Sequence, residues 1–237
     1  MTVTAKSTPE EAEAWKVEKK LNDAYQAIFV VEQQGDCETA IRRYESEVVP
    51  AAQSSKFAVP KNKFLFLANR GIGNCRLAQR RYEEAERKFT EIMEYLPIWP
   101  GTDDSAYPIN LRQIATAQMG QQHWAAAEDS LKKSISLFDA TIERARKWDK
   151  ESGGVEFAGP PIGLKATTLA YLGIVYLREG RVSDALKTSD TAWDTVMQPH
   201  VPSSFQSGVV KLGLAIAQAS GDENAISEWK LRSSQQK

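Results

Sequence analysis

Apolar residues recur along this chain at intervals of three and four residues, which is the period of one face of an α-helix. They do not alternate strictly with polar residues, as they would in a half-buried strand. The pattern therefore predicts an all-α protein without a sheet. A long helix is expected from Trp124 to about Lys150, because apolar side chains repeat at helical spacing at Leu131, Ile135, Phe138, Ile142, Ala145 and Trp148.

The first expected helix has a well-marked beginning and end. Thr8 can act as N-cap, Pro9 suits the first helical position, and Glu11 can complete a capping box. A helix of about 26 residues should then run to Gln34, where Gly35 and Asp36 end it.

A second pattern repeats over longer distances: small residues within one helix are followed by a turn and by an alanine in the next helix. The two clearest copies are Asn69-x-x-Ile72-Gly73-x-x-Arg76, with Tyr82, Ala85, Phe89 and Pro97, and Leu169-x-x-Leu172-Gly173-x-x-Tyr176, with Gly180 and Ala185. Weaker copies contain Ile28, Val31, Gly35, Ala40 and Tyr44; Leu111, Ile114, Ala115, Trp124, Ala127 and Leu131; and Val209, Leu212, Gly213, Ala225 and Trp229.

These copies resemble the tetratricopeptide repeat. The resemblance implies an all-α, tetratricopeptide-like α-solenoid of antiparallel helix pairs that form a right-handed superhelix. It also implies a single domain over residues 1–237. The approximate repeats within that domain are 9–50, 63–97, 106–149, 164–198 and 204–233. Glycine at positions such as Gly73 and Gly173 would let the two helices of a repeat touch closely.

The copies do not keep the 34-residue period of the family. Their anchor alanines, at positions 40, 85, 127, 185 and 225, are 45, 42, 58 and 40 residues apart. Segments rich in Pro, Gly, Ser or Asp are therefore expected to form extended loops between repeats, at 50–63, 97–108, 150–163 and 198–204. Trp99, in the second of these loops, is a candidate surface anchor.

Composition narrows the class of partner. The chain contains 30 Lys and Arg against 31 Asp and Glu, so it lacks the basic excess that nucleic-acid binding requires. The longest uninterrupted apolar runs, such as residues 27–31, are far too short to span a membrane. Only Cys37 and Cys75 are present, which suits a reducing compartment. A cytoplasmic location is expected, although a chain with its signal peptide trimmed off would look the same.

No arrangement of residues suggests catalysis or a cofactor. His123 and His200 have no neighbouring ligands at metal-binding spacing. The glycines at 71 and 73 fall inside an expected helix, unlike those of a phosphate loop. Cys75 has arginines nearby but no histidine, so a packed thiol is favoured over a nucleophile. The charges between Arg76 and Lys88 alternate in sign and favour a self-compensating solvated face.

The family resemblance implies a concave groove, lined by the first helix of each pair, that receives a partner segment. Its inward positions include the candidate binding residues Asn22, Tyr25, Phe29, Arg70, Asn74, Arg112, Met119 and Arg178. We expect Tyr25 and Phe29 to hold an apolar anchor and Arg70, Asn74 and Arg112 to form one polar wall that favours an acidic segment. The Lys-x-x-x-Asn and Lys-x-x-x-Arg positions of carboxylate-clamp co-chaperones are not matched here.

The sequence thus favours a non-catalytic scaffold or adaptor that binds a protein or peptide without a cofactor. The alternatives are a regulatory module that senses a ligand or signalling peptide, and a carboxylate-clamp co-chaperone. The oligomeric state is left open.

Overall fold

The computed structural model describes residues 8–95, 105–151 and 157–234, and within these residues it contains helices and no strand. This confirms the predicted fold class. The described helices group into two compact units, Met1–Thr102 and Asp103–Lys237. The expected single domain stays a prediction.

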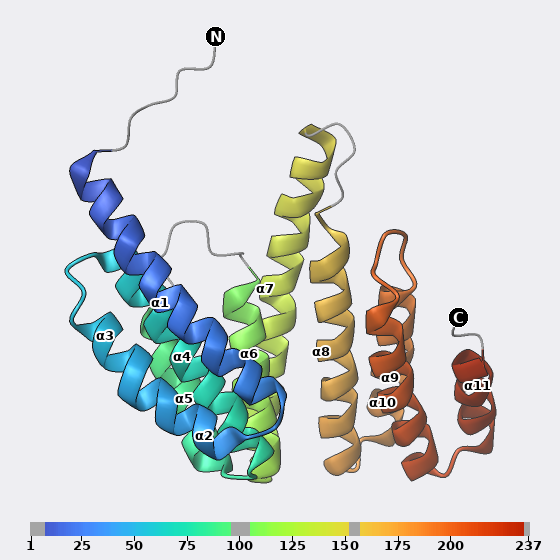
Figure 1. The fold of residues 1–237 in the computed structure, drawn as a ribbon. Coiled ribbons are helices and arrows are strands. Elements are labelled where there is room, and N and C mark those ends of the chain that lie inside the picture. Colours follow the sequence, from blue (N-terminus) through green and yellow to red (C-terminus); the bar gives the residue numbers. More distant parts are fainter. Residues whose placement is uncertain (1–7, 96–104, 152–156, 235–237) are drawn as a thin grey trace. The chain divides into compact units, whose positions relative to one another are not determined.

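The first unit contains two antiparallel helix pairs (Figure 1). Its elements are α1 (Pro9–Gln33), α2 (Cys37–Arg43), the π-helical turn η1 (Tyr44–Val48), α3 (Val49–Gln53), α4 (Ala58–Ala78), α5 (Tyr82–Glu91) and the 3₁₀ turn η2 (Ile92–Glu94). The continuous run α2–η1–α3 returns alongside α1, and α4 packs against both. Leu21, Ile28, Tyr44 and Phe64 are among the buried residues of its core.

The second unit is a row of three hairpins. Its helices are α6 (Ala106–Gly120), α7 (Trp124–Glu151), α8 (Gly159–Arg178), α9 (Val182–Val196), α10 (Ser204–Ser220) and α11 (Glu223–Ser234). Each hairpin packs against the next, because α7 contacts α8 and α10 contacts both α8 and α9. The first helix of each pair, namely α1, α4, α6, α8 or α10, is called the A helix below.

The local signals at the first helix act as expected. The backbone N–H of Glu11 donates to the Thr8 hydroxyl at 3.2 Å, and the backbone N–H of Thr8 donates to the Glu11 carboxylate at 2.7 Å. The helix ends at Gln33, two residues before Gly35, whose φ of +84° is a left-handed conformation suited to glycine. The expected long helix is also present as α7, from Trp124 to Glu151.

The glycines at helix crossings confirm the close packing expected of the repeat pattern. A Cβ on Gly73 would lie 2.6 Å from the Phe89 ring of α5. A Cβ on Gly173 would lie 3.0 Å from Ile216 and 3.1 Å from the Ser189 hydroxyl. A larger side chain at these positions would therefore push the two helices apart.

The expected loop at 50–63 is wrong, because helix occupies most of it. Proline in a helix has no N–H to bond the carbonyl four positions earlier, so Pro50 would ordinarily interrupt a helix here. The chain instead makes the π turn η1 just before it, in which the N–H of Val49 bonds the carbonyl of Tyr44, five residues back. The widened turn lets the helix continue through Pro50 to Gln53.

The loops expected at 97–108 and 150–163 end earlier than expected, because α6 already begins at Ala106 and α8 at Gly159. Pro60, Pro108 and Pro161 each lie in the first turn of a helix, in α4, α6 and α8. The first four N–H groups of a helix have no intrahelical partner, so proline removes nothing there. The expected break at 198–204 is confirmed, because α9 ends at Val196 and α10 begins at Ser204. Trp99 lies outside the described residues.

Candidate partner-binding site

A polar cluster joins α1, η1 and α4 inside the first unit. The hydroxyl of Tyr44 donates to the Glu32 carboxylate at 2.8 Å, and the Asn74 amide donates to the same carboxylate at 3.4 Å. Gly71 makes room for this contact, because a Cβ there would lie 2.6 Å from the Tyr44 ring and 2.8 Å from a Glu32 oxygen. Burial, and then the charge of Glu32, raise the pKa of Tyr44 far above its usual range. Asn74 therefore contributes to an internal cross-link as well as to the surface.

The aromatic residues of α1 form a stack beside this cluster. The ring centroid of Tyr25 lies 5.9 Å from that of Phe29, 5.9 Å from that of Tyr44 and 6.4 Å from that of Phe64. Tyr25 is only 6% exposed, so it is a core residue of the first unit. Phe29 and Asn22 remain partly exposed on the same helix.

Arg70, on α4, faces aromatic residues. Its guanidinium carbon lies 5.1 Å from the centroid of the Phe66 ring. Burial raises the pKa of Tyr25, while the charge of Arg70 and its hydrogen bond to the Tyr25 side chain act in the opposite direction. Across the part of the chain that the structure describes, Arg70 forms no ion pair with a carboxylate.

Arg112, on α6 of the second unit, is the most unusual of the predicted site residues. Its Nε–H is buried and has no hydrogen-bond partner within the described part of the chain. Burial lowers the pKa of Arg112, and the nearby Tyr171 of α8 acts against that effect. Among the described residues no carboxylate forms an ion pair with this guanidinium. The structure therefore places on α6 a half-buried arginine whose guanidinium is largely desolvated and has no carboxylate partner among the described residues.

The other two predicted residues of this unit differ in exposure. Met119, two turns after Arg112 on α6, packs partly buried against the cluster formed by Leu172 and its neighbours. Arg178 is exposed at the last residue of α8. Arg70 and Asn74 belong to the first unit and Arg112 to the second, so a shared polar wall stays a prediction.

Sequence reasoning missed Tyr171, which only the packing of α8 on its neighbours brings close to Arg112.

Sequence reasoning also treated the two cysteines separately. Burial, followed by hydrogen bonding to Cys37, raises the pKa of the Cys75 thiol above its ordinary value, and Arg76 opposes this only weakly. Cys75 is 1% exposed. The packed interpretation of Cys75 therefore holds, because burial outweighs the neighbouring arginine.

The charged run beginning at Arg76 is self-compensating, as expected. Arg76 and Arg81 both pair with Glu84, at 3.2 and 2.5 Å, and Lys88 pairs with Glu91 at 2.8 Å. These cations are therefore already matched by carboxylates of α5. None of the helices in the described ranges is long and apolar enough to cross a membrane.

Neither a protein-family model nor a curated protein sequence matches this chain. Solved structures do resemble it. BtubC (BKLC) from P. vanneervenii has a TM-score of 0.61 at 13% identity, with 96% of this chain and 91% of that chain covered. A variant of a Podosopora anserina protein assigned as a kinesin light chain with nearly identical TPR-like repeats has a TM-score of 0.60 at 12% identity, with 92% and 94% covered.

The MamA protein has a TM-score of 0.52 at 16% identity, with 92% of this chain and 89% of that chain covered. Identities this low establish the fold alone. The chain therefore has the tetratricopeptide-type fold, an all-α solenoid of helix pairs.

Proposed function

We propose that this tetratricopeptide-type solenoid is a non-catalytic scaffold that holds a peptide or partner segment against its A helices. The observation that carries the proposal is the largely desolvated guanidinium of Arg112, whose buried Nε–H has no partner among the described residues. Placing an unpaired charge away from water costs several kcal/mol. A charged side chain whose pKa is strongly perturbed by burial is a candidate for a functional site, because a ligand can supply the opposite charge that the protein lacks.

The chemistry of Arg112 favours an acidic partner segment. A guanidinium presents its N–H groups in a planar fork that matches a carboxylate with two parallel hydrogen bonds. A carboxylate from the partner would satisfy the orphan Nε–H and neutralise the charge in one step. Tyr171, on the neighbouring helix α8, would stand beside that contact.

The first unit supports the same kind of contact. Arg70 forms no ion pair with a carboxylate among the described residues and lies over the Phe66 ring, so its charge is available to an acidic residue of a partner. Phe29 keeps part of its ring exposed next to the buried Tyr25. An apolar anchor of the partner would therefore meet Phe29, with Tyr25 supporting it from behind.

A scaffold fits the thiol chemistry better than an enzyme does. A nucleophilic cysteine needs a lowered pKa and access to substrate. Cys75 has a raised pKa and is almost completely buried. The chain would then act by holding its partner, without a cofactor.

The test uses a phage-displayed library of random peptides, selected on the full immobilised chain. We expect the enriched peptides to be rich in Asp and Glu. Binding of the synthesised peptides is then measured by fluorescence anisotropy with the parent chain and with Arg112→Gln. Loss of one charge-assisted contact of about 1.5 to 3 kcal/mol should weaken binding by roughly 10-fold to 150-fold.

Arg146→Gln is the matched control, because Arg146 is exposed on α7 and pairs locally with Glu143. It should leave peptide affinity unchanged. Selection of peptides without acidic residues, or equal affinity for the parent and Arg112→Gln, would contradict the proposal.

A further inference from the structure

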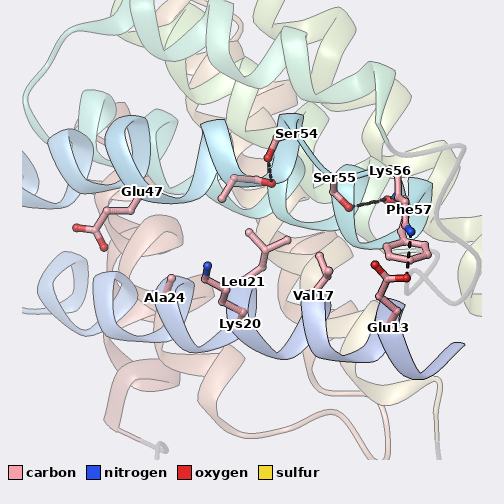
Figure 2. A pocket seen from close by; sticks show the side chains of 11 residues that line it. Glu13, Val17, Lys20, Leu21, Ala24, Glu47, Ser54, Ser55, Lys56 and Phe57 are labelled. Atoms are coloured by element: carbon pink, nitrogen blue, oxygen red, sulfur yellow. Dashed lines mark hydrogen bonds and ion pairs between the residues drawn. The ribbon is translucent and has the colours of Figure 1, made fainter. Parts of the chain in front are cut away.

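A groove separates α1 from the returning segment η1–α3 in the first unit (Figure 2). Its volume is about 620 Å³, within the range of roughly 300 to 1,000 Å³ typical of binding clefts. No residue of α4, the A helix that packs against both walls, lines it. The groove is therefore separate from the seam that α4 fills, and Arg112 is not among the residues that line it.

One wall is a stripe of α1, and the other combines residues of η1 and α3 with residues 54–57, which lie between α3 and α4. The residues from α1 recur at intervals of four, three and four positions, at Glu13, Val17, Lys20 and Ala24, with Leu21 beside them. The opposite wall has the same spacing at Glu47, Ala51 and Ser54. Such rows form the ridges between which a further helix packs. The stripe of α1 runs over 12 residues, from Glu13 to Ala24, and the 11 steps between them give a length of about 16 Å or three helical turns.

The apolar part of the lining consists of small or medium side chains and, at one end, the ring of Phe57. Val17, Leu21 and Ala24 come from α1 (Figure 2), and Ala51 comes from α3. Leu21 is 4% exposed because it also belongs to the core, whereas Ala51 is exposed. The π turn η1 carries Glu47 and ends at Val48, three residues before Ala51, so it sets the direction of this wall.

Most polar groups of the lining are already satisfied within the protein. Lys56 binds Glu13 at 3.0 Å and Arg43 binds Glu47 at 2.7 Å. The hydroxyl of Ser54 donates to the Ala51 carbonyl at 3.0 Å. Among the described residues that line the groove, Lys20 is the charged side chain without an ion pair. The groove thus offers an apolar floor and one uncompensated positive charge.

We propose that this groove is a second docking surface, which holds an amphipathic helix of a partner protein with one carboxylate directed at Lys20. A helix is the favoured occupant because the same two walls, α1 and α2–η1–α3, already pack against the helix α4 elsewhere. The occupant would present about three turns of small apolar residues to Val17, Ala24 and Ala51. It would extend the row of packed helices at the N-terminal end of the first unit.

The test probes the whole chain with a display library of three-turn helical peptides that carry an apolar stripe and one variable position. We expect enrichment of peptides with Asp or Glu at that position. Ala51→Arg, which fills the groove from an exposed position, should weaken the selected peptides at least 10-fold in fluorescence anisotropy. Lys20→Glu should reverse the preference toward Lys or Arg at the variable position.

Ala126→Arg is the matched control, since Ala126 is an exposed alanine of α7 in the other unit, and it should bind as the parent does. Circular dichroism confirms that each variant is folded. Arg112→Gln should also leave this binding unchanged, which separates the groove from the site proposed above.

Failure to enrich any helical peptide, or equal binding to the parent and to Ala51→Arg, would overturn the proposal. Sedimentation analysis tests whether a second copy of this chain occupies the groove instead. A concentration-dependent dimer that Ala51→Arg abolishes would assign the groove to a second copy of this chain, and would also overturn the proposal.

Discussion

The buried hydroxyl of Tyr44 donates a 2.8 Å hydrogen bond to the carboxylate of Glu32, twelve residues earlier in the chain. Tyr44 begins the π turn, and Glu32 stands in the last turns of α1. The bond therefore fixes the widened turn against the first A helix. It also fixes the wall of the groove that follows the turn, because Ala51 lies two turns farther along the same helical run.

Tyr44→Phe should destabilise the first unit by about 1.5 to 3 kcal/mol, because the partly buried Glu32 carboxylate loses a hydrogen-bond donor. The shape of the core is otherwise kept, so cavity effects are small. Urea unfolding followed by circular dichroism measures the loss. Tyr82→Phe is the control, since no hydrogen bond of the Tyr82 hydroxyl occurs among the described residues. Equal unfolding midpoints for the two variants would show that the Tyr44 bond contributes little.

Two glycines of α10 should respond in opposite ways to the same substitution. A Cβ on Gly213 would lie 2.3 Å from the ring of Trp229, which is 1% exposed and cannot move aside. Gly213→Ala should therefore cost about 1 to 3 kcal/mol through overpacking. Gly208 has no atom within 4 Å of such a Cβ.

Gly208→Ala should stabilise the chain by about 0.5 to 1 kcal/mol, because alanine loses less backbone entropy in a helix. Thermal unfolding of both variants and the parent shows whether each substitution raises or lowers the stability of the chain. A stable Gly213→Ala would mean that α10 and α11 pack less closely than described.

Stability should fall at alkaline pH through Cys75. The folded state raises the pKa of this thiol, so between the unfolded pKa of about 8.5 and the folded value the unfolded chain has lost the proton that the folded chain keeps. Unfolding is therefore favoured as pH rises, by up to about 1.4 kcal/mol for each pH unit above 8.5.

Urea unfolding at pH 7.5 and pH 10 measures the effect, and Cys75→Ala should remove part of the pH dependence whatever it does to absolute stability. An identical pH dependence in the two proteins would contradict the prediction. Cys37 should also react with alkylating reagents well before Cys75, because Cys37 is partly exposed.

Arg112→Met should raise the free energy of unfolding by about 1 kcal/mol or more, because it replaces an unpaired buried charge with an apolar side chain of similar length. The same variant should lose affinity for acidic peptides. Stability gained at the expense of binding is typical of a residue kept for function.

Arg232→Met is the matched comparison. Arg232 binds Asp190 at 2.7 Å, and its guanidinium carbon lies 4.5 Å from the centroid of the Trp229 ring. This variant should be destabilised, because it loses both an ion pair and a cation–π contact. Destabilisation of Arg112→Met to the same extent would mean that Arg112 has a structural role.

The sequence alone determined the helices and the way in which they pair. Short-range chemistry decides these features, so the Thr8 and Glu11 cap, the long apolar stripe of α7 and the break between α9 and α10 were all predictable. Gly73 and Gly173 also indicated where helices cross, because a missing side chain matters only at a close approach. The resemblance to the repeat pattern then gave the fold.

The tertiary structure alone decided what the side chains meet. Proline at position 50 is compatible with either a loop or a helix, and the packing of Tyr44 beside Glu32 accompanies the π turn that keeps the helix intact. Likewise, the sequence pattern around an arginine on an A helix is the same whether the side chain is solvated or buried. Only the packing of α8 places Tyr171 near Arg112, whose Nε–H is left without a partner, because burial depends on residues that are far away in the sequence.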